Sequence, residues 1–282
     1  MSLQSRAVTM TKQMIQIEST DPGTYENAMA DWITTQLAPY PNVRLSRQEV
    51  LPGRPNLIAE LTGDPSLPAL VMICHMDTVV VGDGWTLPPF DAIEKDGKIY
   101  GRGACDMKSG LACCLSAFQY AAETLQTSGK TPKQTLKLIC SMDEEDFMRG
   151  SEACIQAGWV TDHDWVIDAE PTNGQIQMAH KGRTWYEIDV QGHTAHASTP
   201  WKGADAIAAM AEIIREIRHA ILYAPVHPDM GSSTVTFGQI TGGYRPYVVP
   251  DHCKVWIDMR LVPPLNTEKT NAIVEAAIEH AD

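Results

Sequence analysis

The sequence predicts an α/β fold with a mainly parallel sheet, followed by a smaller α+β unit. Three apolar runs, at residues 69–73, 136–140 and 165–167, have the length of buried strands. The mostly apolar stretch 107–126 lies between the first two runs and has the length of a helix. Strands that alternate with helices in this way are typical of a parallel α/β layer. After residue 180 the order of predicted elements becomes β-α-β-β-α.

The first predicted helix covers residues 25–37, because apolar residues recur there at helical spacing (Ala28, Met29, Trp32, Ile33 and Leu37). Residues 56–61 and 70–74 are predicted as strands. Asp96-Gly97 lies between two isoleucines and predicts a hairpin turn. The long apolar helix at 107–126 is expected to be buried against the sheet.

In the second unit, residues 184–191 alternate in polarity and predict a strand. Residues 204–222 form an amphipathic helix with an apolar face made by Ile207, Met210, Ala211, Ile214, Ile217 and Ile221. Strands at 233–240 and 253–259 and a helix at 267–281 follow. This order matches a ferredoxin-like unit that lacks its closing strand. We therefore predict two domains, at residues 1–180 and 181–282.

Composition narrows the class of protein. Lys and Arg number 22 against 35 Asp and Glu, which gives a formal charge of −13. This balance argues against a nucleic-acid partner and against an anionic membrane surface, because both need a basic face. No apolar run has the length of a membrane span, and the first thirty residues do not look like a signal peptide. The seven cysteines are irregularly spaced, which predicts reduced thiols in a cytoplasmic protein.

Polar motifs follow the three apolar runs that predict strands. They are Cys74-His75-Met76-Asp77, Asp143-Glu144-Glu145 and Asp168-Ala169-Glu170. Between the first two, Asp106 lies in a glycine-rich stretch that opens the long helix. Ligands bind at the carboxyl ends of strands in open α/β sheets, so these motifs predict a single site. A nitrogen and oxygen ligand set without thiolates suits zinc, and also cobalt or manganese.

In this order the motifs resemble the dinuclear-zinc aminoacylase and carboxypeptidase family, which includes acetylornithine deacetylase, succinyl-diaminopimelate desuccinylase and carboxypeptidase G. The resemblance runs from about residue 10 to the end. It implies a zinc-exopeptidase-like catalytic domain with an inserted ferredoxin-like lid domain, through which two copies form a homodimer. It also implies two zinc ions per subunit and hydrolysis of the amide bond of N-acyl amino acids or small peptides.

The same resemblance assigns the metal ligands. His75 and Glu170 are implied as ligands of one metal, with Asp168 as the alternative to Glu170. Asp106 is implied as the carboxylate that bridges both ions, and the peptide bond after it as cis. Glu145 is implied as a ligand of the second metal.

Two further residues of the same domain receive catalytic roles from the resemblance. Asp77 is implied as the carboxylate that orients His75, since a ligating imidazole commonly donates its second N–H to such a group. Glu144 is implied as the general base that takes a proton from water and returns it to the leaving amine. Asp143 and Asp146 flank the glutamate pair and remain alternatives.

In the lid, the loop 192–198 resembles a family loop whose histidine reaches the active site of the partner subunit and stabilises the oxyanion. His196 fits that position, with His193 as the alternative. Arg260 resembles an arginine that binds a substrate carboxylate. Tyr247 stands where the family often has an asparagine that contacts the substrate. At this position the sequence therefore departs from the family pattern.

The family's last metal ligand is a histidine in a C-terminal segment for which this sequence has no counterpart, and His280 lies in an unrelated context. We therefore expect a C-terminally truncated chain that binds one metal well and hydrolyses substrate poorly. The alternative function is an inactive fragment or binding module that keeps only lid-mediated dimerisation. A magnesium phosphotransferase is disfavoured by His75 and by the lack of a phosphate-binding loop.

Overall fold

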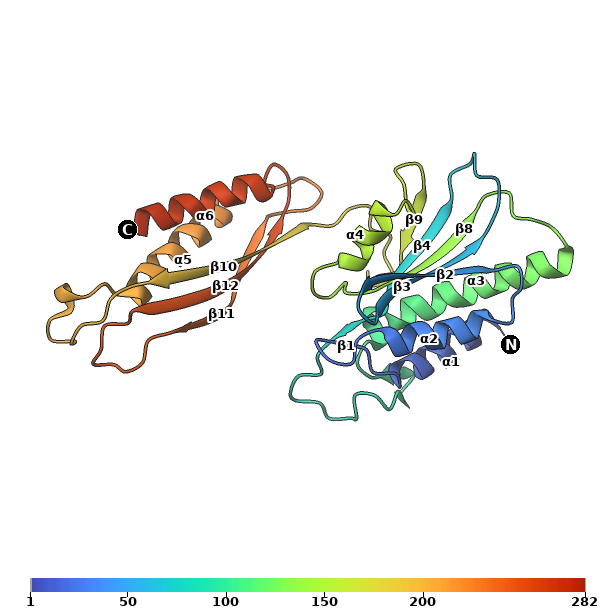
Figure 1. Ribbon diagram of the computed structural model, residues 1–282, viewed down its shortest axis with the longest axis horizontal. Helices are drawn as coiled ribbons and strands as arrows, with labels where there is room; N and C mark the ends of the chain where they lie inside the picture. The colour runs from blue at the N-terminus through green and yellow to red at the C-terminus, as the bar shows by residue number, and fades with distance from the viewer. Residues whose placement is uncertain (1, 282) are drawn as a thin grey trace. The chain divides into compact units, whose positions relative to one another are not determined.

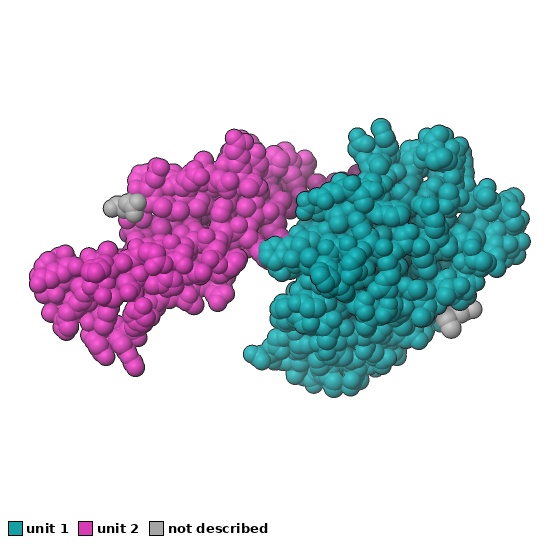
Figure 2. Space-filling model, in the orientation of Figure 1, with its two compact units in different colours: residues 1–175 teal, residues 176–282 magenta. Residues whose placement is uncertain are grey.

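The computed structural model of the protein describes residues 2–281, so Met1 and Asp282, the outer ends of the predicted domains, lie outside the described residues. The chain forms two compact units, residues 1–175 and 176–282 (Figures 1 and 2). The boundary therefore lies five residues before the predicted one. Each unit has a sheet and helices of its own.

The sheet of the first unit has five strands. In spatial order they are β2 (Arg44–Leu51), β3 (Arg54–Leu61), β8 (Leu136–Ser141), β4 (Leu70–His75) and β9 (Trp165–Asp168). Strand β3 is antiparallel to both of its neighbours, whereas β4 is parallel to both β8 and β9. Four strands thus run in one direction, which confirms the mainly parallel sheet. The carboxyl ends of β4 and β8 lie side by side, because His75 pairs with Ser141.

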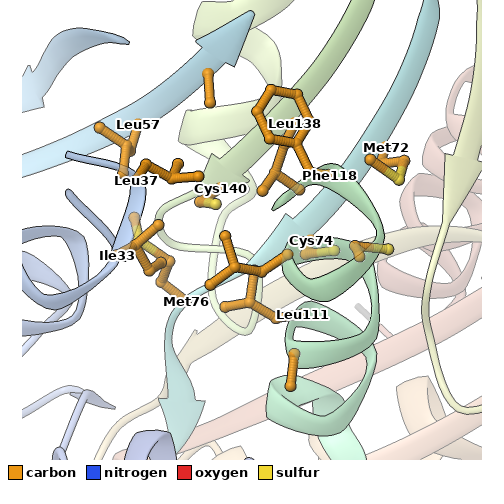
Figure 3. Close-up of a cluster of buried hydrophobic side chains, with 14 of the residues drawn as sticks. Ile33, Leu37, Leu57, Met72, Cys74, Met76, Leu111, Phe118, Leu138 and Cys140 are labelled. Atoms are coloured by element: carbon orange, nitrogen blue, oxygen red, sulfur yellow. The ribbon is translucent and has the colours of Figure 1, made fainter. Parts of the chain in front are cut away.

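One face of this sheet is covered by three helices, α1 (Leu3–Ile15), α2 (Asn27–Leu37) and α3 (Ser109–Ser128) (Figure 1). Their apolar faces pack on alternate residues of β3, β4 and β8, as Figure 3 shows for Phe118 and Leu138. The remaining strand residues point to the other face and pack with Cys154 of α4 (Arg149–Gln156). The predicted burial of the long helix is confirmed.

Short elements complete the first unit. Strand β1 (Thr20–Asp21) pairs in parallel with β5 (Thr78–Val79), directly after the end of β4. The predicted hairpin at Asp96-Gly97 is confirmed, with β6 (Ile93–Lys95) antiparallel to β7 (Lys98–Tyr100). A π-helical turn, η1 (Ala104–Lys108), leads into α3 and contains the cis peptide bond predicted after Asp106.

Strand β9 lies at the edge of the sheet, so the prediction that residues 165–167 form a buried strand is wrong. It pairs only with β4 among the described strands, and Trp165, Val166 and Ile167 are 66, 50 and 50% exposed. Apolar composition indicates what a strand can bury, whereas its place in the sheet decides what covers it.

The second unit has a three-stranded antiparallel sheet in the order β10 (Gly182–Gln191), β12 (His252–Leu261), β11 (Thr234–Gly242). Helices α5 (Ala206–Leu222) and α6 (Thr267–Ala281) pack on one face of it through a core of their own (Figure 1). Asp205 caps α5 by accepting from two backbone N–H groups. The predicted order of elements is confirmed. Between residues 2 and 281, no helix combines the length and apolar character needed to span a bilayer.

Candidate metal centre

His75 is the last residue of β4 and is almost completely buried, with 2% of its surface exposed. Its Nδ1 lies 2.9 Å from the backbone carbonyl oxygen of Asp77. A carbonyl can only accept, so Nδ1 carries the hydrogen and Nε2 is left for another partner. The backbone N–H of His75 donates to the sulfur of Met107 at 3.0 Å. The ring is therefore held with Nε2 available to bind a cation.

Carboxylates surround that nitrogen. Nε2 lies 3.1 Å from Oδ1 of Asp106, 3.5 Å from Oε1 of Glu170 and 4.0 Å from Oε2 of Glu144. Possible ligand atoms around His75 form two groups, and within each group all atoms lie within 4.8 Å of one another. One group is His75 with Asp106 and Glu145, and the other is His75 with Glu144 and Glu170. The structure thus brings together every residue proposed as a metal ligand from the sequence.

The spacing of these atoms suits a small divalent ion. Zinc binds nitrogen and oxygen at about 2.0–2.1 Å, so two ligand atoms in a tetrahedral site lie about 3.3 Å apart. The distances of 3.1 and 3.5 Å from His75 Nε2 to Asp106 and to Glu170 bracket this value. The donor set also fits, because imidazole and carboxylate are ordinary zinc ligands and no thiolate is among them.

The charges of the site point the same way. Burial alone would lower the pKa of His75, but the hydrogen bond to Asp106 and the carboxylate of Asp77 raise it to about 11. Burial raises the pKa of Glu170 to about 8, with Asp106 adding to the shift and His75 opposing it. Burial and the Asp106 charge also raise the pKa of Glu145. A cluster that retains protons so strongly has a deficit of positive charge, which a divalent cation would relieve.

The orientation of His75 by the carboxylate of Asp77 stays a prediction, and the structure shows other hydrogen bonds for that carboxylate. Its Oδ1 lies 3.6 Å from Nδ1, beyond hydrogen-bond distance, and the backbone carbonyl of the same residue takes the contact instead. The two carboxylate oxygens accept the backbone N–H groups of Glu144 and Glu145 at 3.2 and 2.9 Å. Asp77 therefore connects the β4 end with the loop that carries the glutamate pair.

Glu144 and Glu145 both lie within ligand distance of the site, because each belongs to one of the two groups of ligand atoms around His75. Asp168, the alternative to Glu170, belongs to neither group among the described residues. Asp143 is fully buried, and its carboxylate receives the guanidinium of Arg149. Because its carboxylate is paired with this cation, Asp143 is less suited than Glu144 to proton transfer.

The other candidate residues lie in the second unit. His196 is exposed, and its Nδ1 lies 2.8 Å from the hydroxyl oxygen of Ser198. His193 pairs with Ala204 through backbone hydrogen bonds. Arg260 donates from Nε to Asp258 at 2.8 Å, and Tyr247 is 58% exposed. His280 lies in α6 and donates from Nδ1 to the carbonyl of Ala276.

Three residues that contact the loop at residues 142 and 143 were not identified from sequence motifs. They are Glu26, Arg54 and Asn56. One signal was present: Asn56 is a polar residue at the start of the apolar run 57–59, in a strand that was predicted. A buried amide needs hydrogen-bond partners, so its position was informative.

Comparisons with known proteins show the family to which the chain is similar. A family model described as peptidase family M28 matches residues 56–221, and an M20 model described as a peptidase dimerisation domain matches residues 178–282. A probable succinyl-diaminopimelate desuccinylase from Staphylococcus aureus is 30% identical over 256 residues, which are 81% of this chain and 61% of that protein. Acetylornithine deacetylase from Photorhabdus laumondii is 32% identical over 233 residues, covering 80% of this chain and 58% of the relative. The chain thus spans about three fifths of the length of these relatives.

Solved structures share the fold. An M20 family metallo-carboxypeptidase from Sulfolobus solfataricus superposes with a TM-score of 0.76 at 18% identity, covering 98% of this chain and 75% of that one. Aminopeptidase PepT from Bacillus cereus gives a TM-score of 0.67 at 23% identity, with 99% of this chain and 72% of that one covered.

Proposed function

The chain belongs to the M20/M28 metallopeptidases, and from this premise we propose that it is a metal-dependent hydrolase that cleaves the amide bond of N-acyl amino acids or small peptides. The observation that carries the proposal is the convergence of His75, Asp106, Glu145 and Glu170 on one site, with Glu144 beside them. The charge and spacing of these groups support binding of a divalent ion.

In this proposal His75 and Glu170 would hold one ion, Glu145 would hold a second, and Asp106 would serve as a further ligand. Zinc is the first candidate, with cobalt or manganese as alternatives. When bound, the ions supply Lewis-acid activation of water and of the substrate carbonyl. Glu144 takes a proton from the attacking water and later gives it to the leaving amine.

The second unit supplies binding and assembly. The match to a dimerisation domain supports a homodimer through residues 178–282. We propose that His196 stabilises the oxyanion in the active site of the partner subunit and that Arg260 binds the substrate carboxylate through its bidentate fork. The names of the relatives favour succinyl or acetyl groups as the acyl part of the substrate. We place the protein in the cytoplasm, as its seven free cysteines suggest.

The test combines metal titration with a substrate panel. Apoprotein is titrated with Zn²⁺ and Co²⁺ in a calorimeter, and each loaded form is then incubated with N-succinyl amino acids, N-acetyl amino acids and dipeptides. Release of free amine is measured, with Glu144→Gln as the control for turnover and His75→Ala as the control for binding. We expect metal binding that depends on His75 and amine release that depends on Glu144. Failure of the wild-type chain to bind either ion would overturn the proposal, and binding without amine release from any substrate would favour a binding module.

A further inference from the structure

Side chains hold the backbone of the loop that carries Glu144 and Glu145. Four consecutive N–H groups, those of residues 142–145, are accepted by side chains from other elements. Asn56 Oδ1 accepts from residue 142 at 3.0 Å, and Glu26 Oε1 accepts from residue 143 at 3.1 Å. The two carboxylate oxygens of Asp77 accept from residues 144 and 145. The loop therefore takes its position from β3, from the start of α2 and from the end of β4.

Asn56 also connects the two ends of this loop. Its Nδ2 donates to the carbonyl oxygen of Gly150 at 2.8 Å, so one buried amide side chain joins residues 142 and 150. A Cβ atom at Gly150 would collide with the carbonyl oxygen of Met142 and with Oδ1 of Asn56. The close approach thus needs glycine, and the two ends of the loop are held at a fixed separation.

Arg54 supplies the positive charge behind the loop. Its Nε donates to Oε2 of Glu26 at 2.9 Å, and its Nη2 also contacts Asp21 and reaches Oδ1 of Asp143 at 3.3 Å. All four residues are at most 8% exposed. Three buried carboxylates need this guanidinium, because an uncompensated buried charge is strongly unfavourable. Since Arg54 already lies among these carboxylates, we assign no metal to the acidic groups there.

We propose that Glu26, Arg54 and Asn56 are positioning residues that fix Glu144 and Glu145 against His75, an inference that rests on the proposed function. None of the three belongs to the groups of ligand atoms around His75. Asn56 and Glu26 accept the backbone N–H groups of residues 142 and 143, and Arg54 acts through the carboxylates of Glu26 and Asp143. The carboxylate of Glu144 lies on the side of the histidine. Metal ligands need to be held within about 0.5 Å of the productive geometry, so a loosened loop would lower metal affinity.

The test uses isosteric variants of the full chain. Glu26→Gln removes the anion that pairs with Arg54, and Asn56→Asp replaces the donor to Gly150 with an acceptor while keeping the acceptor for residue 142. Glu60→Gln is the matched control, because Glu60 lies on the same strand and pairs with Arg44 at 2.9 Å. Two quantities are measured at a temperature where the circular dichroism of all variants is native: amide hydrogen exchange of residues 142–145, and Co²⁺ affinity by competition with a chelator.

We expect both variants to speed exchange of the loop amides and to weaken Co²⁺ binding by about tenfold, while β8 amides and Glu60→Gln stay unchanged. A purely structural role would lower the melting temperature but leave Co²⁺ affinity as in the wild type, and that result overturns the proposal. Unchanged exchange of residues 142–145 overturns it as well.

A second pair of milder substitutions is used if Glu26→Gln or Asn56→Asp does not fold. Arg54→Lys keeps the buried cation and loses only the fork, and Arg44→Lys is its control on the neighbouring strand. Weaker Co²⁺ binding in Arg54→Lys alone supports the positioning role, and equal binding in both contradicts it. If the wild type binds no Co²⁺, the proposed function fails. In that case the exchange of the loop amides alone decides whether Glu26, Arg54 and Asn56 hold the loop.

Discussion

At the scale of single residues, the site depends on a division between atoms that face the metal position and atoms that hold them. His75 uses Nδ1 to fix its ring on a carbonyl and leaves Nε2 for the carboxylates. Asp77 is fully buried, and both of its carboxylate oxygens accept hydrogen bonds from backbone N–H groups. It therefore contributes through geometry as much as through charge, and it belongs with the supporting groups that orient ligands.

Glu144 and Glu145 provide the sharpest residue-scale prediction, because they are adjacent and chemically identical. We expect Glu145→Gln to lower Zn²⁺ or Co²⁺ affinity by about 10–100-fold, since a ligand is lost. Glu144→Gln is expected to keep the affinity and to lose amine release by about 10²–10⁴-fold, since only proton transfer is affected. Calorimetric titration of both variants, followed by the substrate assay, separates the roles. The opposite pattern would mean that the two residues exchange functions.

The candidate site divides sharply into what could be predicted from sequence and what could not. His75, Asp106 and Glu170 stand in short motifs at strand ends or at a helix start, so local pattern was sufficient. Asn56 and Glu26 act on the loop from 86 and 117 residues away. A single sequence does not encode such partners in any local spacing, and the three-dimensional pairing of β3, β8 and α2 is needed to reveal them.

At the scale of elements, α3 anchors the site, because it follows directly on η1, the turn that contains Asp106, and runs under the sheet. Phe118 is completely buried at the centre of its apolar face (Figure 3). We expect Phe118→Ala to lower the free energy of unfolding by about 3–5 kcal/mol, through lost transfer energy and a residual cavity. Urea unfolding followed by circular dichroism measures this change.

Tyr120→Ala is the control on the same helix. Tyr120 is 55% exposed, so its truncation is expected to change the free energy of unfolding by less than about 0.5 kcal/mol. Equal effects of the two substitutions would contradict the packing of α3 against the sheet.

Elements with strong periodicity were predictable, and elements defined by their neighbours were not. The helix in α5 and the strands β8 and β12 follow from their own apolar patterns. Strand β2 escaped prediction because Arg44–Leu51 is mostly polar and only half-buried, as an edge strand can be. Strand β9 shows the reverse error, since its apolar run is exposed at the other edge. Burial at an edge depends on what covers it, which the local pattern does not contain.

At the scale of the whole molecule, the two units have separate cores. The apolar clusters of the first unit involve α1, α2, α3 and α4, and the cluster of the second involves α5 and α6. We therefore expect two transitions in differential scanning calorimetry. All the proposed metal ligands lie in residues 1–175, so added Zn²⁺ should shift only one transition.

The size of that shift follows from mass action. Zn²⁺ at a hundred times its dissociation constant stabilises the bound unit by about 2.7 kcal/mol. For a unit of this size the melting temperature should rise by about 5–10 °C. A chelator should reverse the shift, and Glu145→Gln should reduce it. A shift of both transitions together would contradict the assignment of the site to the first unit alone.

The last prediction concerns assembly. Strand β11 is an edge of the second sheet with Ile240 55% exposed, and Leu222 at the end of α5 is 69% exposed. An open strand edge and exposed apolar side chains favour association with a second copy, and residues 178–282 match a dimerisation domain. We expect sedimentation velocity to show a dimer at concentrations well above micromolar. Ile240→Lys or Leu222→Lys should raise the dissociation constant by about tenfold or more, because a buried charge opposes docking. Ile176→Lys serves as the control, since Ile176 is 92% exposed and precedes the sheet. A wild-type monomer, or a dimer that neither charged variant weakens, would place the contact elsewhere or remove it.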